Sequence, residues 1–496
     1  MKIKTTLIDK LTYIYLSIPL LIFLSTWLNP FFAVISVISL LAILGLIFCQ
    51  LPSGKLEIPG KVLATTIAVC SLWCILSGIG GYFYQNSDFH LRNALLRDLI
   101  NFSFPVRYDN GSAMVYYMGF LMPAAVFGKL MLWLGAPNEI AFKLGDTFNL
   151  LFCTCGVILT ALQLFIYTKP KKYQFYILLF IFIFFSGLDI LYPNVDKEYL
   201  EWHGLLQYSS NTTLLFWVYN QTIAPWLITT LFIKKPFNFK NHIFLAALTL
   251  FFAPMSFLGL GIYIFFLLCY EFIKFVKHNK TAIFLQKLFS PQNILSLLIL
   301  LPILVLYYKS NNTVSEEGLR VFLFNINILI FFILEAGLFL FIIFYKNTKN
   351  PVYYITFLSL MLFPFLRIGT TPDLCMRASI PALFILMVLV IKFLFDKSAN
   401  KTAKIILAVL LLIGICTPYS TFYRGFYVML HPNIETPVKN DIVTLNNKIK
   451  RPCIYQLTNP NDITKIYTNF CNYGTLDADN TVFFKYFASK RKNNGG

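Results

Sequence analysis

Long apolar runs separated by short polar segments make up the chain from its first residues to about residue 420. Runs such as 175–192, 257–272 and 321–345 are long enough to cross the ~30 Å hydrocarbon layer of a bilayer. Because lipid cannot satisfy open backbone groups, each crossing run is expected to be a helix. The pattern predicts about thirteen transmembrane helices, over residues 11–29, 30–50, 62–81, 143–168, 174–192, 213–233, 242–254, 257–275, 292–308, 321–345, 353–366, 379–395 and 405–420.

The composition indicates a bilayer rather than water as the solvent. Hydrophobic residues make up 57% of the 496 residues and charged residues only 13%, whereas soluble domains are about one quarter charged. The net charge of +19 would suit a nucleic-acid binder, but the basic residues lie in short segments between apolar runs. They form no basic stripe with interleaved aromatic residues. Membrane lipid is therefore an expected partner, and nucleic acid is not.

The apolar stretch 113–135 is predicted to lie along the outer membrane surface rather than to cross the bilayer. If it crossed, Lys169 and Lys171 would fall on the outer side and every later loop would invert. Pro123 also argues against one straight span. The stretch is therefore expected to form surface helices within a large outer loop over residues 82–142.

Charged residues predict the orientation of the chain. Segments assigned to the inside hold 20 Lys and Arg residues, against nine in the outer loops before the C-terminal tail. This bias is typical of the cytoplasmic side, so the N-terminus is predicted inside and the C-terminus outside. Twelve acidic residues lie on or near the outer side and four on the inner side. Since acidic residues hardly affect insertion, an active site on the outer face is one explanation.

The final segment, 421–496, changes character and mixes Asn, Asp, Lys and Pro with short apolar runs. This pattern predicts a small α/β domain outside the membrane, which follows a transmembrane domain over residues 1–420. Cys453 and Cys471 are candidates for a disulfide in an oxidising compartment. The expected fold class is an all-α polytopic membrane protein with this small extracytoplasmic C-terminal domain.

The first large outer loop holds several residues that could carry chemistry. Asp88 lies just beyond the predicted end of a span, where a carboxylate could act as a base at the membrane surface. His90, Arg92 and Arg97 follow within about three helical turns. The alternative is a surface amphipathic helix whose charges are simply solvated.

The second outer loop, 196–213, is dense in hydrogen-bonding and aromatic residues. Glu201 and His203 are its candidate substrate-binding residues, because such a mixture suits a sugar or a lipid headgroup. An ordinary interfacial aromatic belt explains the same pattern. His203 taken alone is more often structural than catalytic.

Two arginines flank an aspartate where two later spans meet the outer side. Arg367, Asp373 and Arg377 lie within eleven positions, and guanidinium forks suit phosphate oxygens. The alternative is an Arg–Asp pair that locks a turn. Glu335, in the middle of a predicted span, is a functional candidate because carboxyls in a bilayer are costly. It could equally be a protonated group bonded to a neighbouring helix.

Residues 115–120 (Val-Tyr-Tyr-Met-Gly-Phe), 129–135 and 139–144 resemble the region that follows the first outer loop in GT-C glycosyltransferases. Examples of that superfamily are the protein O-mannosyltransferases and the aminoarabinose transferases of lipid A. Their Tyr-rich surface helix is followed by an Ala-x-Arg segment, in which Lys143 replaces the arginine here. The resemblance covers about residues 62–195 and includes the number of spans.

The resemblance implies a glycosyltransferase of the bacterial cytoplasmic (inner) membrane, part of the cell-envelope machinery. Such enzymes pass a sugar from a polyprenyl-phosphate-linked donor to a glycan, lipid or protein acceptor on the outer face. Asp88 matches their catalytic aspartate by position, and Arg367 and Arg377 match the late-loop basic residues that bind the lipid phosphate. No cofactor is identified, and a divalent cation stays open.

Two other functions fit the same pattern of spans. A transporter or flippase of lipid-linked glycans would use the intramembrane Glu335 to couple transport to ions. A polysaccharide polymerase would share the outer arginines but would not need the Asp88 loop. The sequence names neither the sugar nor the acceptor.

Overall fold

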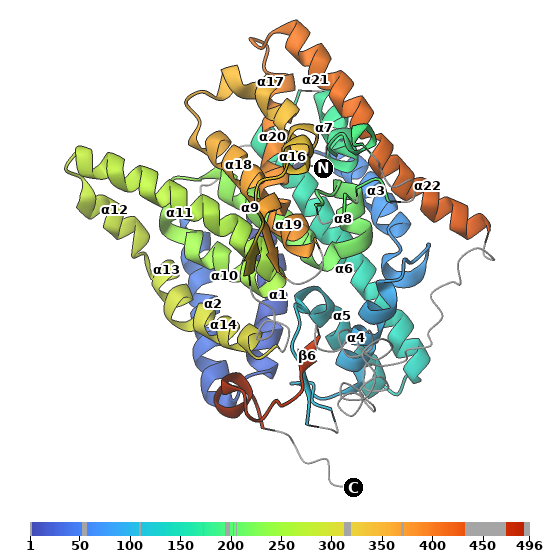
Figure 1. Cartoon of the computed structure of the whole chain (residues 1–496). Helices are drawn as coiled ribbons and strands as arrows, with labels where there is room; N and C mark the ends of the chain where they lie inside the picture. Colours follow the sequence, from blue (N-terminus) through green and yellow to red (C-terminus); the bar gives the residue numbers. More distant parts are fainter. Residues whose placement is uncertain are drawn as a thin grey trace.

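The computed structural model describes residues 2–51, 57–108, 111–171, 173–193, 199–201, 203–204, 206–311, 319–368, 372–431 and 473–490. Within these ranges the chain is a bundle of helices that cross at varied angles, and strands occur only as two-stranded ribbons (Figure 1). The chain is an all-α membrane protein, as the apolar pattern predicts.

The first half of the bundle runs from α1 to α11, with α4 and α5 inside the large loop. The bounds of these helices are α1 Thr5–Thr26, α2 Pro30–Gln50, α3 Gly60–Leu76, α4 Phe89–Asn101, α5 Met122–Trp133, α6 Asn138–Thr168, α7 Gln174–Phe184, α8 Asn211–Val218, α9 Ile223–Lys234, α10 His242–Phe252 and α11 Pro254–Lys277.

The second half continues with shorter segments that stack end to end into spans. Its helices are α12 Thr281–Leu288, α13 Pro291–Leu295, α14 Leu301–Lys309, α16 Ile326–Phe332, α17 Leu338–Asn347, α18 Pro351–Leu362, α19 Asp373–Ala378, α20 Ile380–Phe395, α21 Lys401–Gly414 and α22 Cys416–Leu430. Three antiparallel ribbons pair β1 Lys2–Lys4 with β2 Glu57–Pro59, β3 Ala113–Met114 with β6 Gly474–Thr475, and β4 Leu319–Val321 with β5 Leu366–Ile368.

Seven helical segments of the described chain are long and apolar enough to cross a membrane. The other six predicted spans coincide with apolar helices of 10–17 residues, so the count of thirteen crossings stays a prediction. The seven long segments are Thr5–Thr26, Pro30–Gln50, Asn138–Thr168, Pro254–Lys277, Pro291–Lys309, Ile326–Asn347 and Lys401–Leu430.

Two predicted spans are interrupted for identifiable reasons. The run 213–233 forms two helices, α8 and α9, because Pro225 has no N–H to donate to the carbonyl of Gln221 and its ring would clash there. The segment Ile326–Asn347 contains a π-helical turn over Ile333–Gly337, which holds Glu335. Such turns widen the helix and frequently occur at functional sites. The bundle contains similar turns at Ser296–Leu300 and Phe483–Phe487.

The stretch 113–135, predicted to lie on the surface, contains β3 and the twelve-residue helix α5. At 1.5 Å per residue α5 is about 18 Å long, which is short for a crossing. It packs closely on α4 and α6: a methyl group added at Gly128 would collide with Ile100. Its relation to the membrane surface stays a prediction.

The predicted domain boundary at residue 420 falls inside a helix, since α22 continues to Leu430. Most of 421–496, including Cys453 and Cys471, lies outside the described residues. The described part, 473–490, is joined to the bundle by the β3–β6 ribbon and by Phe483, whose ring centroid lies 5.2 Å from that of Tyr307.

Candidate functional site

Asp88 directly precedes α4 and is held by short-range contacts. The side-chain oxygen of Asn86 accepts a hydrogen bond from the Asp88 N–H at 3.1 Å, and its Nδ2 donates to the Phe216 carbonyl at 2.9 Å. Arg92, one turn further along, donates to Asp88 Oδ2 at 2.8 Å. The Asp88 side chain is still 47% exposed, so one face of the carboxylate is free to meet a substrate.

Arg92 is buried beneath Asp88 instead of lying in solvent. Its side chain is 6% exposed, donates to the Trp217 carbonyl, and lies over the rings of Phe89 and Tyr219 at 5.3 and 5.5 Å. Its Nη1 has no partner among the described residues. Arg92 therefore orients the Asp88 carboxylate, and its Nη1 remains available to donate a further hydrogen bond.

A second pair of the same kind comes from α19. Arg377 Nη2 lies 2.9 Å from Asp373 Oδ1, again with a spacing of four residues. Its Nη1 donates to the Tyr117 hydroxyl at 2.8 Å, and its backbone carbonyl accepts from Ser256 Oγ at 2.7 Å. The close packing of α19 on α11 depends on Gly259, because a methyl group added there would collide with the Ala378 carbonyl at the end of α19.

Three tyrosines lie where these two pairs meet. The ring centroids of Tyr116 and Tyr117 are 3.7 Å apart, and those of Tyr116 and Tyr473 are 4.6 Å apart. Burial raises the pKa of the Tyr473 hydroxyl, as do Tyr117 and the Asp88 carboxylate, while Arg92 and Arg377 oppose the shift. We call this group the arginine–tyrosine cluster; its members are Asp88, Arg92, Tyr116, Tyr117, Asp373, Arg377 and Tyr473.

The other predicted residues of this group have different surroundings. Arg97 lies over the ring of Phe142 at 5.8 Å, on the side of α4 that faces α6, and His90 is partly exposed on the first turn of α4. Arg367 is on β5, with its guanidinium 5.7 Å from the Phe322 ring centroid. The described contacts therefore link Arg377 to the tyrosines and do not link Arg367 to them.

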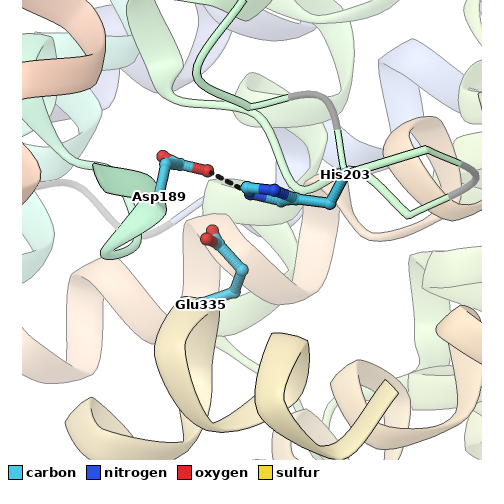
Figure 2. A group of neighbouring side chains, drawn as sticks. All are labelled: Asp189, His203 and Glu335. Atoms are coloured by element: carbon cyan, nitrogen blue, oxygen red, sulfur yellow. Dashed lines mark hydrogen bonds and ion pairs between the residues drawn. The ribbon is translucent and has the colours of Figure 1, made fainter. Parts of the chain in front are cut away.

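Glu201 and His203 lie in a second, more deeply buried group. His203 Nε2 is 3.4 Å from Asp189 Oδ1, and both side chains are at most 1% exposed. Glu335 points toward Asp189 and His203 from the π-helical turn (Figure 2). We call Asp189, Glu201, His203 and Glu335 the carboxylate–histidine cluster.

Polar neighbours satisfy only part of this cluster. Asp189 Oδ2 accepts hydrogen bonds from Ser186 Oγ at 3.0 Å and from Thr417 Oγ1 at 2.7 Å. Glu335 is 2% exposed, yet neither of its carboxyl oxygens has a hydrogen-bond partner among the described residues. Gly187 leaves the room for that carboxyl, because a methyl group there would collide with Glu335 Oε2.

Glu201, in the loop before α8, is the fourth member. Its Oε1 accepts from the Ser210 N–H at 2.9 Å, whereas Oε2 has no partner in the described chain. Burial, and then the neighbouring Asp189, raise the pKa of the Glu201 carboxyl above its ordinary value. The sequence predicts Glu201 and His203 as substrate-binding residues, and that role stays a prediction; the structure shows that both side chains are buried.

Four members of these clusters are not identified as site residues from the sequence: Tyr116, Tyr117, Asp189 and Tyr473. Tyr117 lies in the quoted Tyr-Tyr motif, so a signal was present, and Asp189 is a carboxylate at the end of an apolar run, which is itself unusual. Tyr473 follows a long polar segment, and no pattern marks it.

A comparison of the chain with protein-family models, curated proteins and solved structures finds no match.

Proposed function

We propose that the chain is a GT-C-like glycosyltransferase of a bacterial cytoplasmic membrane. It would move a sugar from a polyprenyl-phosphate-linked donor to an acceptor hydroxyl on the outer face. The observation that carries the proposal is that two carboxylate–guanidinium pairs, Asp88–Arg92 and Asp373–Arg377, lie near one group of tyrosines: Arg377 contacts Tyr117, and both pairs contribute charges that act on Tyr473. A transferase of this class needs a base and a phosphate-binding cation side by side.

Asp88 is the base in this proposal. Its half-exposed carboxylate takes the proton of the acceptor hydroxyl while the acceptor oxygen forms a bond to the anomeric carbon. The bond from that carbon to the phosphate oxygen breaks, and its electron pair leaves with the polyprenyl phosphate. Arg92 holds Asp88 in position from below, so the base need not reorganise during the reaction.

Arg377 is the phosphate-binding residue. Its fork has one branch on Asp373, which is one third exposed, and one on the Tyr117 hydroxyl. An incoming phosphate can replace either partner with shorter, charge-assisted bonds and so stabilise the charge that develops on the leaving group. Tyr117 and Tyr473 are partly exposed, and their rings offer a surface on which a sugar ring can stack.

The reaction on the outer face requires the orientation inferred from the basic loops. In this arrangement the N-terminus is inside, the C-terminus is outside, and 113–135 does not cross. Replacement of Lys171 by cysteine tests this orientation. Labelling of that cysteine by an impermeant maleimide from outside the cell would contradict it.

The decisive experiment replaces Asp88 by asparagine, which keeps the shape and removes proton acceptance. We expect Asp88→Asn to lower turnover by about 10²–10⁴-fold, with little change in donor binding. Consumption of a short-chain polyprenyl-phosphoryl hexose by purified protein, and envelope glycan in cells, are the measurements. The exposed Glu139→Gln is the matched control and should keep full activity.

A transporter is the second candidate, and the carboxylate–histidine cluster is the observation that favours it. Buried carboxyls without cationic partners are typical of proton- or ion-coupled carriers. A transporter predicts that Glu335→Gln abolishes function and that Asp88→Asn does not. Loss of function in Glu335→Gln together with normal function in Asp88→Asn, in variants of unchanged melting temperature, would reject the transferase proposal and favour a transporter.

A further inference from the structure

We propose that Asp189, His203 and Glu335 bind one divalent transition-metal cation, such as Zn²⁺, inside the helical bundle. The three residues come from the turn after α7, the loop before α8 and the π-helical turn between α16 and α17 (Figure 2). The proposal is independent of the transferase proposal, because metal binding can be measured without any substrate.

The geometry fits a single ion. One ligand atom from each residue can be chosen so that all three lie within 4.8 Å of one another. Zinc bonds of ~2.0–2.2 Å place tetrahedral ligands about 3.4 Å apart, so side-chain movements on the order of 1 Å would close the site. The partners would then be one imidazole nitrogen and two carboxylate oxygens, which leaves a position for water.

The charge of the cluster also calls for a cation. Among the described residues, no Lys or Arg forms an ion pair with Asp189, Glu201 or Glu335. Glu335 is aimed at the other two ligands, and neither of its carboxyl oxygens has a hydrogen-bond partner in the part of the chain that the structure describes. An unpaired buried carboxylate is strongly destabilising, whereas a divalent ion neutralises two of them at once.

The surroundings hold the ligands in the way that metal sites usually require. Ser186 and Thr417 donate to the Asp189 oxygen that His203 does not contact, and Tyr192 packs on the imidazole with its ring centroid 3.9 Å away. Such outer contacts fix the orientation of ligands. Gly187 provides the space into which the Glu335 carboxyl projects.

The ligand chemistry selects the class of ion. Mg²⁺ and Ca²⁺ prefer shells made of oxygen alone and keep several waters, for which a fully buried site has little room. An imidazole with two carboxylates suits Zn²⁺ and its first-row neighbours. Because all three side chains are buried, the ion should enter as the protein folds and exchange slowly afterwards.

The test measures the metal content of the full chain purified in detergent with metal-free buffers. We expect about one first-row metal ion per chain by inductively coupled plasma mass spectrometry, retained through dialysis. Removal by a strong chelator should lower the melting temperature, and Zn²⁺ added at about a hundred times Kd should restore ~2–5 °C, whereas Mg²⁺ should not.

Variants assign the ion to its ligands. Asp189→Asn, His203→Gln and Glu335→Gln should each lower the metal content at least about tenfold. The control Glu271→Gln changes another buried carboxyl, which is paired with Lys274 at 3.5 Å, and should keep the metal. The wild-type measurement stands even if a ligand variant fails to fold.

Two results would overturn the proposal. One is a wild-type protein that carries no stoichiometric metal and whose melting temperature is unchanged by Zn²⁺, Mn²⁺, Fe²⁺ and Co²⁺. The other is equal metal content in the wild type and in all three folded ligand variants, which would put the ion elsewhere in the chain.

Discussion

The two clusters handle buried charge in opposite ways. In the arginine–tyrosine cluster, Asp88 and Asp373 each have a guanidinium four residues further along, at 2.8 and 2.9 Å. In the carboxylate–histidine cluster the three carboxyls have one imidazole beside them and no Lys or Arg partner in the described chain. The first cluster is complete by itself and has donors to spare for an anion. The second is incomplete, and only protons or a cation can balance it.

Arginine chemistry gives the sharpest test of the first cluster. Arg377→Lys keeps the charge but loses the fork that reaches both Asp373 and Tyr117, so we expect use of the lipid donor to fall about 10–100-fold. The assay is donor consumption against donor concentration. Arg367→Lys is the control, because its guanidinium lies on Phe322; an equal loss in both variants would show that the carrier site includes β5.

The space beside Glu335 gives the corresponding test of the second cluster. Gly187→Ala would drive a methyl group into Glu335 Oε2, and overpacking of this kind costs about 1–3 kcal/mol. Thermal unfolding in detergent measures the loss of stability. Gly261→Ala, where an added methyl meets nothing within 4 Å, should be neutral or slightly stabilising. An unchanged melting temperature in Gly187→Ala would mean that the cluster has room to relax.

The smallest effect is expected at the Tyr117 hydroxyl, which accepts a hydrogen bond from Arg377. Tyr117→Phe removes the acceptor of one Arg377 hydrogen bond but keeps the ring, and a single bond of this kind contributes about 1 kcal/mol. Donor affinity should then change by roughly threefold to tenfold, in a titration with labelled polyprenyl phosphate. A loss as large as that of Arg377→Lys would instead give Tyr117 a direct part in the chemistry.

Local features of the fold could be read from the sequence, and long-range ones could not. Apolar runs located the helices, and the four-residue spacing of Asp88 with Arg92, and of Asp373 with Arg377, is visible in one dimension. The break before α9 has a local cause in Pro225, which the hydropathy pattern alone did not reveal.

The assembly of each cluster depends on packing between distant helices. The spacing along the chain does not show that Asp189 meets Glu335, because the contact depends on the π-helical turn and on the small size of Gly187. Nor does it show that Tyr473 returns to Tyr116 beyond a long polar segment. The sequence therefore indicates Glu335 and Arg377 as functional candidates, but it does not predict which residues their side chains contact.

The helices α21 and α22, which follow one another end to end, lead to an expectation about how deep the molecule lies in a membrane. Thirty residues give about 45 Å of helix, well beyond the ~30 Å of hydrocarbon, and ordinary tilts shorten this too little to fit it. Its final turns carry a ladder of exposed tyrosines, Tyr419, Tyr423 and Tyr427, whose rings follow one another at 6.3 and 5.7 Å. Tyrosines prefer the headgroup layer. We therefore expect these tyrosines to mark the level of the headgroup layer, and bilayers of different thickness should place different tyrosines of the three in that layer.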